Sequence, residues 1–239
     1  MNTLGKPPSG WDKNIITQNF DAARSNQFAT FHNLKDWVDR LSDIDRAYRK
    51  AIEGLNNTND WFPGFFLPRS HSSFLAACSL CWAGQTPETY PVLRLCLENA
   101  LYSFYFYKNP QTCEVWLKRS DNDKTKKAVR DEFKAAKMIQ LLQQVDAKEG
   151  KVANQLNERL IDFGAHPNEL GMMQAMVHRP DLNGFDYLYL TSNQLVIESC
   201  LKTLAQVGVC SLSIYRNIYK TRFDVLGLTK MLDDIRKCF

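Results

Sequence analysis

Apolar residues recur every three or four positions between residues 34 and 55, and this spacing restricts the fold more than any other feature of the chain. Charged residues occupy most of the positions between them. A helix repeats every 3.6 residues, so the apolar side chains fall on one face and the charged ones on the other. The pattern predicts an amphipathic helix that must bury one face against other elements. The apolar positions are Leu34, Trp37, Leu41, Ile44, Tyr48, Ile52 and Leu55.

Two later segments are more apolar still. Residues 87–107 are apolar nearly all round, which is typical of a helix in the centre of a bundle. A long apolar helix is also predicted from residue 192 to about residue 219. Within the first of these segments Arg94 and Glu98 are four positions apart, so they share a helix face and can pair with each other. The chain is therefore predicted to be all-α, a multi-helix bundle.

The helical period is lost between residues 172 and 190. Two short runs there flank an Asn183–Gly184 turn, which predicts one small β-hairpin. Residues 1–13 are predicted to form a flexible N-terminal tail, and residues 14–239 a single helical domain. A chain of 239 residues buries roughly 70–75% of its extended surface on folding, so its core is large enough to be stable without disulfide bonds or metal ions.

Composition argues against several classes of protein. The chain is 44% hydrophobic and 23% charged, which is ordinary globular usage. No apolar run is expected to span a bilayer, because charges interrupt residues 87–107, and the N-terminus has no apolar secretion segment. The seven cysteines, including the C-x-x-C of Cys78 and Cys81, are predicted to be reduced core residues. We therefore expect a cytoplasmic protein with no membrane partner, no cofactor and no metal site.

A helix predicted from Asp121 or Asp123 to about Val145 carries a row of basic residues on one face. Such a face suits the phosphate backbone of a nucleic acid or an acidic protein partner. The alternative is a face that is only solvated, since acidic residues are interspersed along it. The basic residues are Lys126, Arg130, Lys134 and Lys137.

The stretch LIDFGAHPNELG, residues 160–171, ends a further predicted helix. Gly164 suits a helix end with positive φ, and Pro167 prevents the helix from restarting at once. In one interpretation the polar residues that follow only complete the helix end. In the other, they gather beside the Arg94–Glu98 pair, where mixed charge near an imidazole can bind a ligand. The polar residues are Asp162, His166, Asn168 and Glu169.

Arg159 precedes His166 by seven positions, and this R-x6-H spacing resembles the motif of HEPN ribonucleases. The resemblance implies an all-helical protein in which the motif pairs across a dimer and cleaves RNA without a metal. The histidine would then transfer protons and the arginine would support phosphate charge. The chain departs from the family in having Leu160 after the arginine and Gly164 before the histidine.

Two stretches together resemble a family of uncharacterised bacterial helical proteins. They are GQTPETYPVLRLCLENALYSFYFYKNP, residues 84–110, and LIDFGAHPNE, residues 160–169. The resemblance covers about the central half of the chain and implies a bacterial cytoplasmic protein without naming an activity. The residues that belong to the family pattern are Gln85, Glu88, Arg94, Glu98, Tyr102, His166, Pro167 and Asn168.

These patterns support two functions of different classes. The leading prediction is a ligand-binding or regulatory interaction module, with a homodimer as its expected assembly. Its ligand-binding residues would be Arg94, Glu98, His166 and Asn168. The alternative is a metal-independent, HEPN-like ribonuclease or toxin-like enzyme in which Arg159 and His166 are catalytic.

Overall fold

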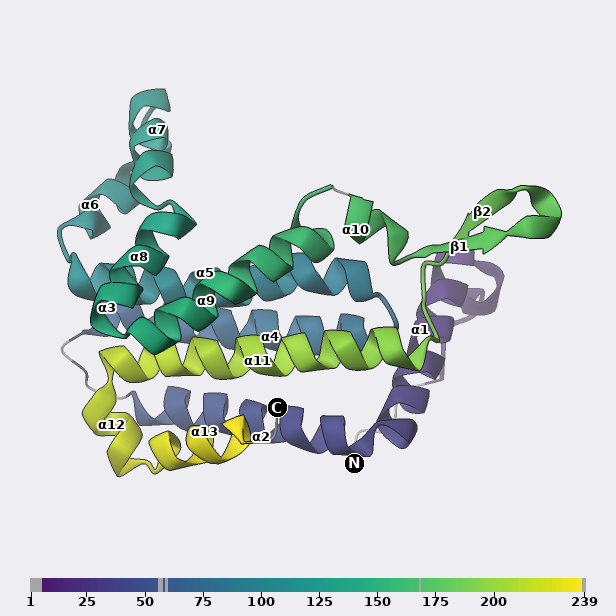
Figure 1. Cartoon of the computed structure of the whole chain (residues 1–239), viewed down its shortest axis with the longest axis horizontal. Coiled ribbons are helices and arrows are strands. Elements are labelled where there is room, and N and C mark those ends of the chain that lie inside the picture. Colours follow the sequence, from purple (N-terminus) through teal and green to yellow (C-terminus); the bar gives the residue numbers. More distant parts are fainter. Residues whose placement is uncertain (1–5, 56–57, 59, 168, 238–239) are drawn as a thin grey trace.

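The structure, a computed structural model, describes residues 6–55, 58, 60–167 and 169–237, and 80% of the chain is helical. Long helices pack side by side in a bundle (Figure 1), which confirms the predicted all-α class. The longer helices are α1 (Ile15–Asn33), α2 (Lys35–Gly54), α4 (Phe66–Trp82), α5 (Thr86–Lys108), α7 (Asp123–Glu132), α8 (Ala135–Val145), α9 (Ala147–Leu160), α11 (Gln194–Ile218) and α13 (Leu228–Arg236). Shorter elements are η1 (Trp11–Lys13), α3 (Trp61–Gly64), α6 (Thr112–Leu117), η2 (Lys118–Ser120), η3 (Ile161–Ala165), α10 (Glu169–Met173), η4 (Pro180–Leu182) and α12 (Lys220–Val225).

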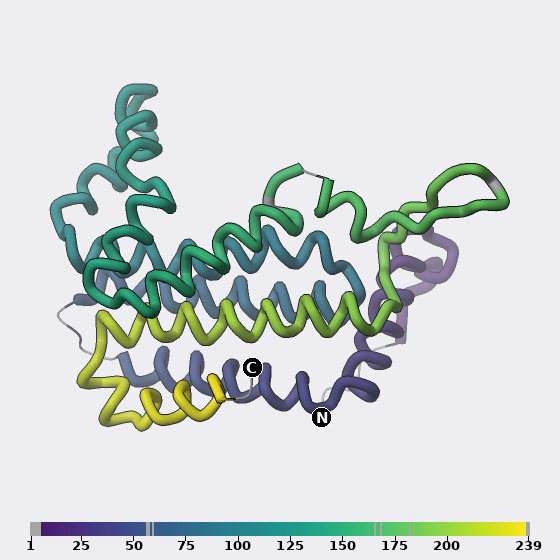
Figure 2. Tube along the Cα trace, in the orientation of Figure 1, coloured from purple at the N-terminus to yellow at the C-terminus, as the bar shows by residue number. Residues whose placement is uncertain are grey.

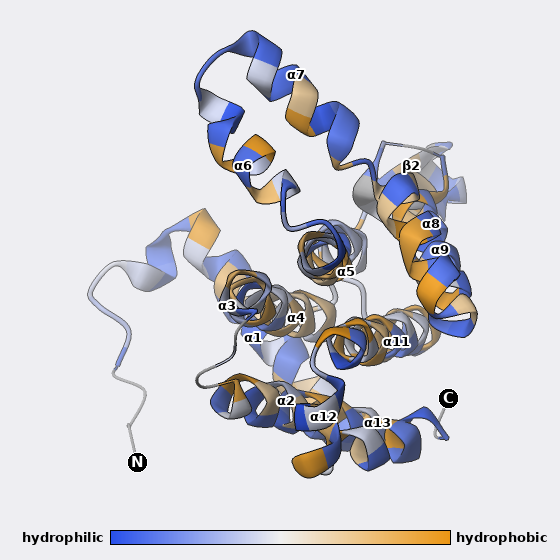
Figure 3. Cartoon of the chain, turned by 90° about the vertical axis from the view of Figure 1, so that its left-hand side faces the viewer, coloured by the Kyte–Doolittle hydropathy of each residue, from blue (hydrophilic) through white to orange (hydrophobic). Residues whose placement is uncertain are grey.

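Helices α5 and α11 form the centre of the bundle. Helix α5 packs mainly against α4 and α11, and α11 also contacts α2, α9 and α13. The end-on view in Figure 3 shows the apolar sides of these helices turned inward. The chain trace in Figure 2 shows α13 running back beside α2, which α13 contacts. The amphipathic segment predicted at residues 34–55 is α2, and its buried side chains include Ile44 and Tyr48.

Gly208 lets α11 approach α2 and α4 closely. A Cβ atom at this position would lie 2.8 Å from Ile44 Cγ2 and 2.8 Å from Phe74 Cε2. Ile44 and Phe74 are both fully buried, so neither side chain has free space into which to move. The absence of a side chain at Gly208 therefore sets the spacing of three core helices.

Helix α11 is, within the described ranges, the one helix long and apolar enough to cross a membrane, although no apolar run was expected to do so from the sequence. About two thirds (67%) of its most apolar window is buried inside the bundle. A helix in a protein core and a helix that crosses a membrane have the same apolar composition, because both are surrounded by apolar groups. Its packing against α2, α4, α5 and α9 accounts for its hydropathy.

The predicted hairpin is confirmed. Strands β1 (Met176–Arg179) and β2 (Gly184–Tyr187) pair antiparallel, with Met176 opposite Tyr187 and Arg179 opposite Gly184. Asn183 adopts a left-handed conformation with φ of 48° in the connecting turn, which asparagine tolerates better than most residues. The hairpin projects from one end of the bundle, and α6 and α7 project near the other (Figure 1).

The prediction of one long helix over residues 121–145 is wrong. Helix α7 ends at Glu132, and Phe133 and Lys134 leave the helical conformation before α8 begins at Ala135. The break lets the Phe133 ring stack on Tyr102, with ring centroids 5.0 Å apart, and pack against Phe106 at 5.1 Å. Aromatic burial in the core outweighs the continuous helix that the local pattern favoured.

Helix α1 has no counterpart in the sequence analysis, which identified no element over residues 15–33. Its N-terminus is capped by Asn14, whose side chain accepts from the backbone N–H of Ile16. Asn26 and Thr30 donate to backbone carbonyls at the end of α4, at 3.0 Å each. Of the predicted tail, residues 1–5 lie outside the described residues, and the Trp11 indole donates to Asp21 at 3.0 Å.

A buried histidine joins α2 to α4. His71 Nε2 lies 2.6 Å from Asp45 Oδ1, and the His71 ring stacks on Tyr48 with centroids 5.0 Å apart. Arg49 also donates to Asp45, at 2.8 Å. Burial raises the pKa of Asp45, but the hydrogen bonds from Arg49 and His71 outweigh it and hold that pKa below its ordinary value.

We expect Gly208→Val to reduce the free energy of unfolding by at least about 2 kcal/mol, because overpacking a close-packed core forces strained rotamers and backbone shifts. Urea denaturation monitored by circular dichroism measures the change. Gly208→Ala adds a smaller side chain for comparison. In a helix without close neighbours, replacing glycine by alanine stabilises the fold by about 1 kcal/mol. A net stabilisation by both substitutions would show that the three helices are not in tight contact at this point.

The Asp45 contacts predict a pH-dependent stability. A carboxyl whose pKa is lowered by folding stabilises the fold above its unfolded value, near pH 4, and this contribution is lost as the pH falls through the folded value. Asp45→Asn should therefore destabilise the protein clearly at pH 7 and much less near pH 3. The matched control is Asp39→Asn, which removes an exposed pair with Lys35 and should cost little at either pH. Equal losses for Asp45→Asn at both pH values would contradict the assignment.

Candidate functional site

The turn predicted at Gly164 has two structural causes. Helix α9 ends at Leu160 and continues into the wider turn η3, in which Gly164 has φ of 150°. A Cβ atom on Gly164 would lie 2.5 Å from the backbone oxygen of Pro87, at the start of α5. Only glycine fits both the positive φ and this close approach. The turn therefore fixes how the end of α9 sits on α5.

His166 follows this turn and is exposed. Arg94 Nη1 lies 2.9 Å from His166 Nε2, and Arg94 Nε donates to Glu98 Oε1 at 2.9 Å. Because an arginine only donates, His166 accepts through Nε2 and carries its proton on Nδ1. Three of the four predicted ligand-binding residues thus lie together, while Asn168 lies outside the described residues. Their role in binding a ligand stays a prediction.

Arg159 turns to a different neighbour. Its Nη1 donates to Gln206 Oε1 on α11 at 2.7 Å, whereas His166 contacts Arg94 on α5. The two residues of the R-x6-H spacing therefore contact different helices. The ribonuclease alternative requires a second subunit to complete the site, so it also stays a prediction.

A cavity of about 330 Å³ lies between α9, α11 and α13, on the side of α9 to which Arg159 points. Ligand pockets in proteins begin at about this volume. Aliphatic side chains form its middle, and charged or amide side chains lie toward its two ends. The lining residues are Lys148, Glu149, Val152, Gln155, Leu156, Arg159, Gln206, Val209, Cys210 and Arg236.

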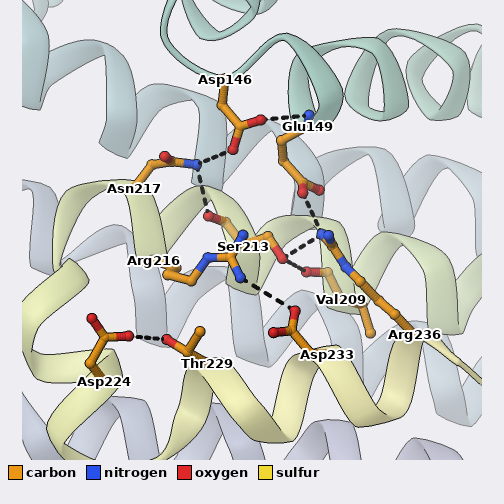
Figure 4. Close-up of polar contacts among 10 residues, drawn as sticks. All are labelled: Asp146, Glu149, Val209, Ser213, Arg216, Asn217, Asp224, Thr229, Asp233 and Arg236. Atoms are coloured by element: carbon orange, nitrogen blue, oxygen red, sulfur yellow. Dashed lines mark hydrogen bonds and ion pairs between the residues drawn. The ribbon is translucent and has the colours of Figure 1, made fainter.

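Glu149 is the most deeply buried charged group of this cavity, with a side chain only 1% exposed. Its Oε2 accepts from Arg236, which also donates to Ser213 Oγ at 2.7 Å (Figure 4). Its other oxygen, Oε1, has no hydrogen-bond partner in the part of the chain that the structure describes. Leaving a buried charged acceptor unsatisfied costs roughly 1–3 kcal/mol or more.

Neighbouring polar contacts hold Glu149 in place. Asp146 Oδ1 accepts from the Glu149 backbone N–H at 3.0 Å and caps α9, and Asn217 on α11 donates to Asp146 Oδ2 at 3.1 Å (Figure 4). Burial raises the pKa of Asp146, but these hydrogen bonds and the nearby Arg216 outweigh it and lower that pKa overall. Arg216 lies 3.6 Å from Asp233, which ties α13 to α11.

Arg159 is half-buried and lies at the opposite end of the cavity from Glu149. In the part of the chain that the structure describes, its side chain donates to the neutral amide of Gln206, and no carboxylate there forms an ion pair with it. Cys210, in the middle of the cavity, is buried. Burial and the neighbouring Glu149 raise the pKa of its thiol well above the ordinary value, so it stays protonated and unreactive.

The predicted basic face does not persist as one surface, because the break at Phe133 and Lys134 divides it between α7 and α8. Lys137 lies 2.8 Å from Glu132 and Lys134 lies 3.4 Å from Asp131. Hydrogen bonds to Glu132 and Tyr105 raise the pKa of Lys137. Lys126 and Arg130 remain on the projecting α7. A nucleic-acid or acidic partner for these residues stays a prediction.

Sequence reasoning missed the cavity, although α9 carries a readable signal. Glu149, Val152, Leu156 and Arg159 are spaced by three, four and three positions, so they share one helix face. On this face of α9, two apolar residues lie between two charged ones, and this order is the sequence feature that could have indicated the cavity. Gln206 on α11 and Arg236 on α13 come from distant sequence, and only the folded chain brings them to this face.

Comparison with known proteins assigns the chain to no family. The chain matches no protein-family model, and no curated protein and no solved structure is significantly similar to it. Among the described residues, no group of three histidine, cysteine or acidic side chains converges to hold a metal ion.

The two residues of the turn should differ in their effect on stability. Gly164→Ala should cost at least about 2 kcal/mol, since positive φ alone costs about 1–3 kcal/mol and the added Cβ meets Pro87. His166→Ala removes one exposed hydrogen bond and should cost less than about 1 kcal/mol. Thermal and urea unfolding of both variants measure this order. A larger loss for His166→Ala would show that the histidine, not the glycine, holds the turn.

Proposed function

We propose that this protein is a ligand-binding module that holds a small organic anion in the cavity between α9, α11 and α13. The observation that carries the proposal is Arg159, a half-buried guanidinium that lines the cavity and, among the described residues, has only an amide for a side-chain partner. Removing a charge from water costs several kcal/mol unless an opposite charge and hydrogen bonds compensate. An anionic ligand would supply both, because a guanidinium binds a carboxylate or phosphate through two parallel hydrogen bonds.

The walls of the cavity favour a ligand with an apolar body. Val152 and Leu156 on α9 face Val209 on α11, and all three line the cavity. Burying an aliphatic chain against them stabilises a complex by about 25 cal/mol per Å² of apolar surface. The anion would then be the head group of an amphipathic molecule.

The lining favours binding over catalysis. It contains no histidine, and its one cysteine has a pKa raised well above the ordinary value by burial and by Glu149. A nucleophile or base that works near neutral pH needs a pKa tuned close to that pH. The predicted class of ligand-binding module is therefore retained, with its site moved from the Arg94–His166 cluster to the cavity.

Three linear eight-carbon carboxylates test this proposal: octanoate, ω-aminooctanoate and octanedioate. We expect at least one of them to bind the full chain in isothermal titration calorimetry and to raise its thermal midpoint. Arg159→Gln should weaken each interaction by about tenfold or more, since a hydrogen bond to a charged group contributes about 1.5–3 kcal/mol. The matched control is Arg24→Gln, which changes an exposed arginine on α1. Binding by none of the three, or equal binding by Arg159→Gln, would overturn the proposal.

A further inference from the structure

The charges that line the cavity do not balance. Three cations, Lys148, Arg159 and Arg236, line it, and among the described lining residues Glu149 is the one carboxylate, so the net charge is +2. Glu149 is itself paired, because its Oε2 accepts from Arg236. A ligand with a single negative charge would leave part of this surplus uncompensated, whereas a dianion would neutralise it.

Two of the cations lie at opposite ends of one face of α9. Lys148 and Arg159 are eleven positions apart, which is about three helical turns, so they share a face and their Cα atoms lie about 16 Å apart along the axis. Val152 and Gln155 lie between them on this face. Neither Lys148 nor Arg159 forms an ion pair with a carboxylate of the described ranges. Each can therefore pair with a negative charge of a ligand.

The end of the cavity near Lys148 also presents the guanidinium of Arg236. Both hydrogen bonds that this side chain makes in the described part of the chain come from Nη2, to Glu149 and to Ser213 (Figure 4). Its other N–H groups can donate to a ligand. The Glu149 side chain is almost fully buried, so an anion in the cavity meets the two cations rather than the carboxylate. This end consequently favours a second anion.

Resting on the proposed function, we propose that the ligand is a linear dianion with one anionic group at each end of an aliphatic chain, as in an α,ω-dicarboxylate. One carboxylate binds Arg159, and the other binds Lys148 and Arg236. The chain between them lies along Val152 and Leu156, which line the middle of the cavity. The separation of Lys148 and Arg159 along α9 requires several methylene groups, because two carboxylates on neighbouring carbon atoms reach only one end.

Calorimetric titration of the full chain compares linear carboxylates that differ at the end far from Arg159. We expect octanedioate to bind about fivefold or more tightly than octanoate, which exceeds the roughly twofold statistical advantage of two equivalent carboxylates. ω-Aminooctanoate should bind no better than octanoate, because its ammonium group would lie beside Lys148 and Arg236. Butanedioate, which is too short to reach both ends, should lose most of the affinity of octanedioate.

The results that would overturn this inference differ from those that would overturn the proposed function. Binding of octanoate or ω-aminooctanoate as tight as that of octanedioate would overturn the dianion and leave the proposed function standing. Equally tight binding of butanedioate would overturn the separation of the two anionic groups. Binding by none of the three eight-carbon carboxylates would overturn the proposed function itself.

A variant of Lys148 gives a second readout, because this side chain is exposed and its replacement leaves the core unchanged. Lys148→Gln should weaken the binding of octanedioate by about threefold or more and leave that of octanoate, which Arg159 holds, unchanged. The matched control is Lys151→Gln, which removes an exposed lysine of α9 that does not line the cavity and should change neither affinity. An undiminished preference for octanedioate in Lys148→Gln, or an equal loss in Lys151→Gln, would overturn the placement of the second carboxylate.

Discussion

The burial of most of α11 inside the bundle is the constraint on which the rest of the structure depends. Helices α2, α4, α5 and α9 pack most extensively against it, and Gly208 sets how closely α2 and α4 approach. The stretch of α11 from Val207 to Tyr215 is buried at every position, so its polar side chains need partners within the core. Ser213 has such partners, since it donates to the Val209 backbone and accepts from Arg236.

The cavity follows from the way α9 meets α11. The two helices pack against each other, and α13 closes one end through Arg236, which bonds to both of them. Short aliphatic side chains, Val152 and Val209, leave the space between the helices partly empty. Exposed side chains, Lys148 and Gln155, also line this space, so it opens to solvent. The anion that we propose as the ligand would enter from that side.

The sequence predicted those elements whose signal is local and strongly periodic. The spacing around Ile44 and Tyr48 identified α2, and the Asn183–Gly184 turn identified the hairpin. It failed at Phe133, where burial of the ring against Tyr102 and Phe106 decides the backbone, because that partner surface exists only in the folded chain. The same reason explains why Glu149 was missed, since its place in a helix start gives no sign of burial beside Arg236.

The end of α9 shows that a spacing in the sequence does not by itself place two side chains on one face. Seven positions complete nearly two full turns of a regular helix, so Arg159 and His166 would share one face if α9 continued unchanged. The wide turn η3 and the positive φ of Gly164 interrupt that geometry before His166 is reached. His166 consequently meets Arg94 on α5, while Arg159 meets Gln206 on α11. One glycine thus separates the two polar clusters, and it leaves Arg159 as the only member of the pair that faces the cavity.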